Sequence, residues 1–220
     1  MDAGTWATLR RMFRAVFLDL DDTLFDRTAA VRRWAAATLP ALDEADEHWL
    51  LACDARGRRP RLELATDLVA RFALTARPEE IASAFPLQLA SHVEREPGVR
   101  EHIARLAIQT RVAVVTNGSG AAQRMKLRRL GLDQLVHAVF ISGELGIAKP
   151  APEIFRNALR WSGQAAADCL FVGDDPVNDI APAAALGLVT AWRERDAWPS
   201  QLAPPTHRLA SIEALAQVCA

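Results

Sequence analysis

The 220-residue chain has few cysteines, no tyrosine and no long apolar run. Its three cysteines, Cys53, Cys169 and Cys219, lie far apart and form no CxxC pair, which argues against a disulfide framework and a structural zinc site. None of the five histidines stands at a spacing typical of metal ligands. No run of about 18 apolar residues exists, so we expect no membrane-spanning helix.

Charge and targeting signals are also sparse. The net charge is -1, so we expect neither nucleic acid nor an anionic membrane as a partner. Residues 1–14 carry three arginines but lack the apolar core of a secretory signal. A reduced, cytoplasmic setting is the expectation that fits these observations. The length suits one domain with an insertion or two small domains, and half of the residues are hydrophobic.

Short apolar runs rich in β-forming residues alternate with helical patterns in most of the chain. The runs that predict buried strands are 15–18, 112–116, 138–142, 169–172 and 188–192. The helical patterns are 98–110, 120–130, 152–161 and 178–186. This alternation predicts an α/β fold with a parallel sheet and right-handed crossovers.

A long helical stretch interrupts the alternation after the first strand. About 90 residues separate Leu24 from Val112, and apolar residues within this stretch recur at helical offsets. Examples are Val31, Trp34, Ala35, Leu39 and Leu42, followed by Leu64, Leu68 and Phe72. We therefore expect a helical insertion from about Asp26 to Pro97.

The insertion contains a basic cluster, Arg56, Arg58, Arg59 and Arg61. Such a cluster is usually a solvated loop. The alternative is a contact for an anionic substrate, and the sequence leaves both interpretations open.

Three aspartates, Asp19, Asp21 and Asp22, lie at the end of the first predicted strand. Two like charges about 4 Å apart repel by about 1 kcal/mol in water and about 4 kcal/mol at an effective dielectric constant of 20. A bound divalent cation would offset this repulsion. We therefore interpret Asp19 and Asp21 as parts of an active site.

Three further polar motifs follow predicted strands or the loops after them. They are Thr116-Asn117-Gly118, the isolated Lys149, and the acidic stretch with Asp174, Asp175 and Asp179. Each alone has an ordinary interpretation: a turn, a surface lysine and a helix-capping loop. In an open parallel sheet, however, ligands bind beyond the carboxyl ends of the strands. We therefore expect all four motifs to converge in one crevice.

With these four motifs in this order, the chain resembles the haloacid dehalogenase superfamily of hydrolases. The helical insertion resembles the cap that one subclass carries between its first and second motifs. The resemblance implies a Rossmann-like catalytic core, residues 1–25 and 98–220, and a mostly helical cap domain, residues 26–97. It also implies a Mg2+-dependent phosphatase, as in most members.

The resemblance implies a role for each motif. Asp19 would be the nucleophile and form an aspartyl-phosphate. Asp21 would protonate the leaving alkoxide and then activate the hydrolytic water. Lys149 would pair with the nucleophile and the phosphoryl group, while Thr116 and the backbone N–H of Asn117 would hold phosphoryl oxygens.

The same resemblance implies Mg2+ as the cofactor. Its expected ligands are the side chains of Asp19 and Asp174 and the backbone carbonyl of Asp21, because Mg2+ prefers oxygen ligands. Asp175 and Asp179 lie close by in the fourth motif. Either could contact the metal directly or through water, and the sequence does not separate them.

Two other functions stay open. A metal-independent 2-haloacid dehalogenase needs no second aspartate and no metal carboxylate, so Asp21 and Asp174 favour the phosphatase. A catalytically silent binding or regulatory module would keep the fold, but the catalytic residue types are intact. A phosphonatase would need a lysine in the cap, and residues 26–97 contain none. We expect a small phosphorylated metabolite as substrate, while its identity and the oligomeric state stay open.

Overall fold

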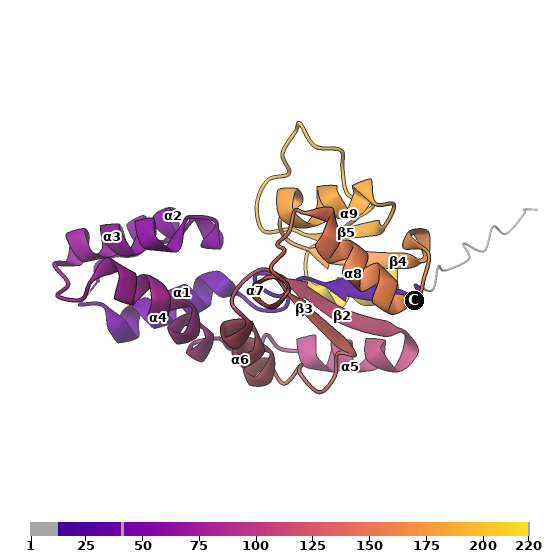
Figure 1. Ribbon diagram of the computed structural model, residues 1–220, viewed down its shortest axis with the longest axis horizontal. Helices are drawn as coiled ribbons and strands as arrows, with labels where there is room; N and C mark the ends of the chain where they lie inside the picture. The colour runs from indigo at the N-terminus through magenta and orange to yellow at the C-terminus, as the bar shows by residue number, and fades with distance from the viewer. Residues whose placement is uncertain (1–12, 41, 220) are drawn as a thin grey trace, which may run out of the picture.

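The computed structural model describes residues 13–40 and 42–219 (Figure 1). Residues 1–12 and Ala220 of the predicted core segments lie outside the described residues. The described chain forms a parallel six-stranded sheet with the order β3-β2-β1-β4-β5-β6. The strands are β1 (Ala15–Leu18), β2 (Arg111–Thr116), β3 (Ala138–Ile141), β4 (Cys169–Gly173), β5 (Val189–Arg193) and β6 (His207–Leu209).

The sheet is covered on both faces, which is the usual environment of parallel strands. Along β1 every residue is buried, and the side chains alternate between two apolar clusters. Val16 and Leu18 join a cluster with α5 (Val99–Gln109) and α6 (Gly120–Leu130). Ala15 and Phe17 join a cluster with α8 (Pro152–Ser162) and α9 (Ala181–Ala185).

Four helices between β1 and β2 form a separate layer, which we call the helical unit. They are α1 (Arg27–Thr38), α2 (Glu44–Asp54), α3 (Arg61–Phe72) and α4 (Pro78–Ser91), with the short turn η1 (Ala55–Gly57) after α2. In Figure 1 the helical unit, in purple, projects to one side of the sheet. The rings of Trp34 and Phe85 pack edge to face with centroids 4.6 Å apart, so Trp34 is a packing residue of this unit.

The predicted strands are confirmed within one residue at each end, and the predicted helices are largely confirmed. The first helix of the insertion ends earlier than its apolar stripe suggests. Leu39 is extended (φ -91°, ψ 158°) because it precedes Pro40, whose ring disfavours helical backbone in the residue before it. Leu39 and Leu42 therefore lie beyond α1.

Three elements differ from the sequence expectation. The helix expected over 178–186 begins as a π-helical turn, η3 (Pro176–Ile180), and continues as α9. The short helix α7 (Ser142–Leu145) and the strand β6 were not predicted, since three or four residues carry no periodic signal. Short turns η2 (Ala166–Asp168) and η4 (Ile212–Ala214) and helix α10 (Leu215–Val218) complete the described chain. In the described part of the chain, we find no helix long and apolar enough to span a bilayer.

Candidate active site

The order of the strands brings the four motifs together. Asp19 follows β1, and the neighbouring strands β2 and β4 end at Thr116 and just before Asp174. The backbone N–H of Asp19 donates to the carbonyl of Val172, 2.8 Å away, which fixes the end of β1 against β4. A cavity of about 880 Å³ lies at this edge, and residues of all four motifs and of the helical unit line it. The predicted convergence is therefore observed.

Three buried carboxylates form a cluster in this cavity. One oxygen each of Asp19, Asp174 and Asp179 lies within 4.8 Å of the others. The Lys149 ammonium donates to Asp19 Oδ1 at 2.5 Å and to Asp179 Oδ1 at 2.6 Å. Lys149 thus contacts two of the three carboxylates, and the third, Asp174, pairs with Arg56 at 2.8 Å.

The pKa values of two carboxyl groups in this cluster, Asp19 and Asp174, are raised. Burial raises the pKa of Asp19 to about 7, and repulsion from Asp179 adds to this against the opposing effect of Lys149. Burial, together with Asp19 and Asp179, also raises the pKa of Asp174 well above its usual range. Buried carboxylates that resist ionisation are a donor set suited to a hard divalent cation such as Mg2+. The residues present therefore fit a metal of this type.

The hydroxyl of Thr23, in the first motif, and the indole of Trp192, on β5, hold the cluster in place. The Thr23 hydroxyl lies 3.2 Å from Asp19 Oδ2 and 3.4 Å from Asp174 Oδ1. Trp192 Nε1 donates to the backbone carbonyl of Asp174 at 2.7 Å. The sequence analysis assigned no role to Thr23 or Trp192, whose contacts cross between different strands.

Asp21 points away from the acidic cluster and toward α6. Its Oδ1 accepts a hydrogen bond from Lys126 Nζ at 2.6 Å, and its Oδ2 accepts one from Gln123 Nε2 at 2.8 Å. Burial would raise the pKa of Asp21, but Lys126 and Arg27 outweigh it and lower that pKa. The Asp21 carboxylate is thus held in its ionised form.

Gln123 and Lys126 lie outside the four motifs predicted from the sequence. A signal was available, because these two residues are three positions apart and therefore share one face of α6 directly after the second motif. Lys126 and Lys149 are also the two lysines of the whole chain. Both have a carboxylate of the first motif as a partner.

The side chain of Asn117 connects two motifs. Its Nδ2 donates to the carbonyl of Lys149 and its Oδ1 accepts from the Lys149 N–H, both at 2.9 Å. The hydroxyl of Thr116 accepts a hydrogen bond from Gln123 at 2.6 Å. The Asn117 amide therefore positions the loop that carries Lys149.

The structure separates the two aspartates that the sequence left undecided. Asp179 belongs to the buried cluster, whereas Asp175 accepts from the N–H groups of Val177 and Asn178 and so begins η3. A Cβ atom on Gly173 would lie 2.4 Å from Asp179 Oδ2, so a glycine at this position lets Asp179 approach the end of β4.

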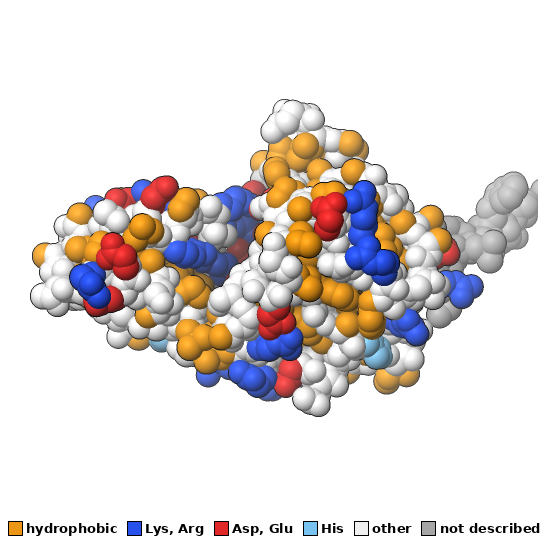
Figure 2. Space-filling view, in the orientation of Figure 1, with side chains coloured by type: hydrophobic (Ala, Val, Ile, Leu, Met, Phe, Trp, Pro, Cys, Tyr) orange, Lys and Arg blue, Asp and Glu red, His pale blue; other side chains and the backbone are white. Residues whose placement is uncertain are grey.

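The helical unit supplies four arginines to the cavity: Arg27, Arg56, Arg58 and Arg61. Figure 2 shows Lys and Arg side chains gathered in the hollow between the helical unit and the sheet-bearing part. Arg56 donates to Asp174 Oδ2 at 2.8 Å and also contacts Asp22 and Asp196, and Arg58 pairs with Asp175 at 2.9 Å.

Two details of the basic cluster differ between sequence and structure. Arg59 pairs with Asp67 at 2.6 Å and does not line the cavity. Arg27 lines it although the sequence analysis gave this residue no role.

Comparisons with known proteins agree with this arrangement. A family model described as haloacid dehalogenase-like hydrolase matches residues 13–187. Glyceraldehyde 3-phosphate phosphatase of Pyrococcus abyssi is 29% identical over 82% of this chain and 81% of its own. N-acylneuraminate-9-phosphatase of Homo sapiens is 28% identical over 90% of both chains. The crystal structure of the magnesium-bound HAD-hydrolase YfnB from Bacillus subtilis superposes with a TM-score of 0.82 at 22% identity, covering 94% of this chain and 99% of that one.

Proposed function

We propose that this chain, which belongs to the haloacid dehalogenase-like hydrolase family, is a Mg2+-dependent phosphatase of small phosphomonoesters. The observation that carries the proposal is the buried group of Asp19, Asp174 and Asp179 with Lys149, open to a cavity large enough for a metabolite. The names of the two relatives above, both phosphatases of phosphorylated metabolites, support it.

In this proposal Asp19 attacks phosphorus. A bond forms between its carboxylate oxygen and phosphorus, and the bond from phosphorus to the ester oxygen breaks. The leaving oxygen takes its proton from the protonated form of Asp21, the minor form at neutral pH, which leaves Asp21 as the carboxylate. Asp21 then takes a proton from the water that cleaves the aspartyl-phosphate. Lys126 and Gln123 favour the ionised form of Asp21, which is the form needed to accept that proton.

The remaining residues bind and orient the phosphoryl group. Lys149, between Asp19 and Asp179, is placed to contact a phosphoryl oxygen as a compact positive charge. Thr116 and the backbone N–H of Asn117 would hold further oxygens.

Asp19, Asp174 and the backbone carbonyl of Asp21 would hold Mg2+, which when bound supplies positive charge for the phosphoryl oxygens. Asp179 would act through Lys149 and at the metal. Asp175 would shape the η3 turn.

The helical unit would act as a cap that closes over the substrate and excludes water. The proposed division places residues 26–97 in the cap and 1–25 and 98–220 in the core, with hinges near 25–28 and 96–98. Arg58 and Arg56 reach from the cap to Asp175 and Asp174 of the core, which gives the closed arrangement specific contacts.

The test is steady-state hydrolysis of an aryl phosphate by the purified protein with Mg2+, with EDTA, and with the variant D19N. We expect EDTA and D19N each to abolish turnover, while E153Q, a substitution of an exposed carboxylate on α8, keeps it. Turnover that survives both EDTA and D19N would refute the proposal. Release of halide from a 2-haloacid without Mg2+, and no phosphate release, would identify the dehalogenase instead.

A further inference from the structure

Two arginines of the helical unit share a single carboxylate beside the cavity. Arg27 donates through both terminal nitrogens to Asp54, and Arg61 donates to Asp54 Oδ1 at 3.0 Å. The side chains of Arg27 and Asp54 are only 4% and 2% exposed, so water screens these charges weakly. One of the two guanidinium charges is therefore left without a carboxylate of its own.

Among the described residues, Arg61 forms an ion pair with no carboxylate other than Asp54. Lys126 and Asp21 form a one-to-one pair at 2.6 Å, and Arg27 Nε lies 3.7 Å from the same Asp21. Arg27, Arg61 and Lys126 thus share the side chains of Asp21 and Asp54, while Asp22 accepts from the backbone N–H of Arg27. The pKa of Arg61 is lowered by burial and by the charge of Arg27, which agrees with crowding of like charges.

The other two arginines that the helical unit supplies to the cavity, Arg56 and Arg58, already have carboxylate partners of their own. Arg56 contacts three carboxylates, and Arg58 pairs with Asp175. Arg61 differs from them, because its second described hydrogen bond is a long one, 3.3 Å, to the carbonyl of Gly57. Its side chain is 31% exposed and lines the cavity, so it is accessible to a ligand there.

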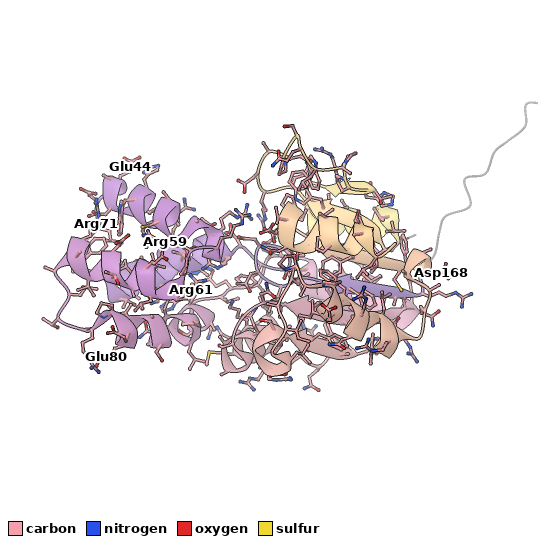
Figure 3. The ribbon with its side chains drawn as sticks, turned by 45° about the horizontal axis from the view of Figure 1, so that its top comes forward. Glu44, Arg59, Arg61, Arg71, Glu80 and Asp168 are labelled. Atoms are coloured by element: carbon pink, nitrogen blue, oxygen red, sulfur yellow. The ribbon has the colours of Figure 1, made fainter. Side chains whose placement is uncertain are left out.

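The surroundings of Arg61 fix its guanidinium group. It lies 5.1 Å from the centre of the Phe85 ring, and Phe85, Pro86 and Leu89 of α4 line the same cavity. In Figure 3, Arg61 lies closer to the core than Glu44, Arg71 and Glu80, which are at the outer end of the helical unit. A cation held over an aromatic ring is preorganised for binding.

We infer that Arg61, backed by Arg27, binds a carboxylate of the substrate, so that the substrates are phosphomonoesters that carry a carboxylate. The inference rests on the proposed function, since it places the phosphoryl group at Asp19 in the same cavity. A planar guanidinium matches a carboxylate in a two-point contact. A substrate carboxylate would give Arg61 an acidic partner of its own, since Asp54 is shared with Arg27.

The experiment compares phosphoglycolate with hydroxyethyl phosphate. Phosphoglycolate carries a carboxylate at the position where hydroxyethyl phosphate carries a neutral hydroxymethyl group. The ratio of their kcat/KM values is measured for the wild-type protein, for R61M and R61K, and for R59M as control. Arg59 belongs to the same basic cluster but pairs with Asp67 outside the cavity. Comparing ratios between variants cancels the difference in leaving-group chemistry.

We expect the ratio in the wild-type protein to exceed the ratio in R61M by about tenfold to a hundredfold, the range for a hydrogen-bonded charge contact. R61K should lower the ratio less than R61M does, and R59M should keep the wild-type value. Aryl phosphate turnover by each variant verifies that the site is folded. If R61M does not fold, the ratio measured for R61K tests the inference in its place.

An equal ratio in R61M, R61K and the wild-type protein would overturn the inference, while aryl phosphate hydrolysis would leave the proposed function standing. No hydrolysis of any of the three phosphates by the wild-type protein would overturn both.

Discussion

At the scale of single residues, the protonation of Asp19 couples the site to pH. Its pKa is raised from 3.8 to about 7 in the folded protein, mainly by burial. The folded state therefore binds more protons at Asp19 than the unfolded state between these two pH values. The free energy of unfolding contributed by Asp19 is present below pH 3.8 and is lost as the pH rises toward about 7.

We predict that, in EDTA, the free energy of unfolding of the wild-type protein falls relative to D19N as the pH rises from about 4 to about 7. Urea unfolding at a series of pH values measures this difference. Mg2+ should reduce the decline, because a metal that binds the carboxylate competes with the proton. A difference that stays constant or grows with pH would show that Asp19 titrates normally.

Lys126 sets the charge state of Asp21, and its replacement gives a second prediction. K126M removes the ammonium 2.6 Å from Asp21, so the pKa of Asp21 should rise and the limb of the pH–rate profile that reports the ionisation of Asp21 should move to higher pH. We expect kcat to fall by about tenfold to a hundredfold, the worth of one charged hydrogen bond. K126R should recover part of the loss, and an unshifted profile in K126M would contradict this role.

At the scale of secondary-structure elements, the sequence carried enough information for the strands and for most helices. Buried apolar runs such as Ala15–Leu18 have a clear signal, and glycine after Leu130 marks the end of α6. The strand β6 has only three residues, and the π-helical start at Pro176 depends on the side chain of Asp175. Such short elements are set by tertiary contacts.

The part of the site that follows the strand ends could be predicted from the sequence, and the part that depends on tertiary contacts could not. The four motifs follow strands, so the topology of a parallel sheet brings Asp19, Lys149 and Asp174 together. The separation of Asp175 from Asp179 depends on which side chain caps η3, and the role of Arg27 depends on the packing of α1 against α2. Neither leaves a local pattern in the sequence.

The buried ion pair between Arg27 and Asp54 joins α1 to α2 and should stabilise the helical unit. D54A removes the common partner of Arg27 and Arg61 and leaves Arg27, only 4% exposed, with its longer contact to Asp21, 3.7 Å. We expect a loss of about 3 kcal/mol in the free energy of unfolding. The control E47A breaks an exposed pair with Arg32 and should cost less than about 1 kcal/mol. Equal losses in the two variants would rule out a structural role for the buried pair.

At the scale of the whole molecule, the cavity lies between the helical unit and the sheet, and both contribute charges to it (Figure 2). A phosphoryl analogue bound there should stabilise the entire fold. We predict that beryllium fluoride with Mg2+ raises the melting temperature, since a ligand at 100 times its Kd adds about 2.7 kcal/mol. D19N should abolish the increase, and an equal increase in D19N would place the analogue elsewhere.

The central claim is that Asp19 accepts the phosphoryl group. Its most direct test is mass spectrometry of acid-quenched D21N protein after mixing with Mg2+ and a phosphomonoester that has a good leaving group, because loss of Asp21 removes the proposed base for the second half of the reaction. We predict a peptide containing Asp19 that is heavier by one phosphoryl group, and no such peptide in D19N. Phosphate release by the wild-type protein with the phosphoryl group on another residue would contradict the account.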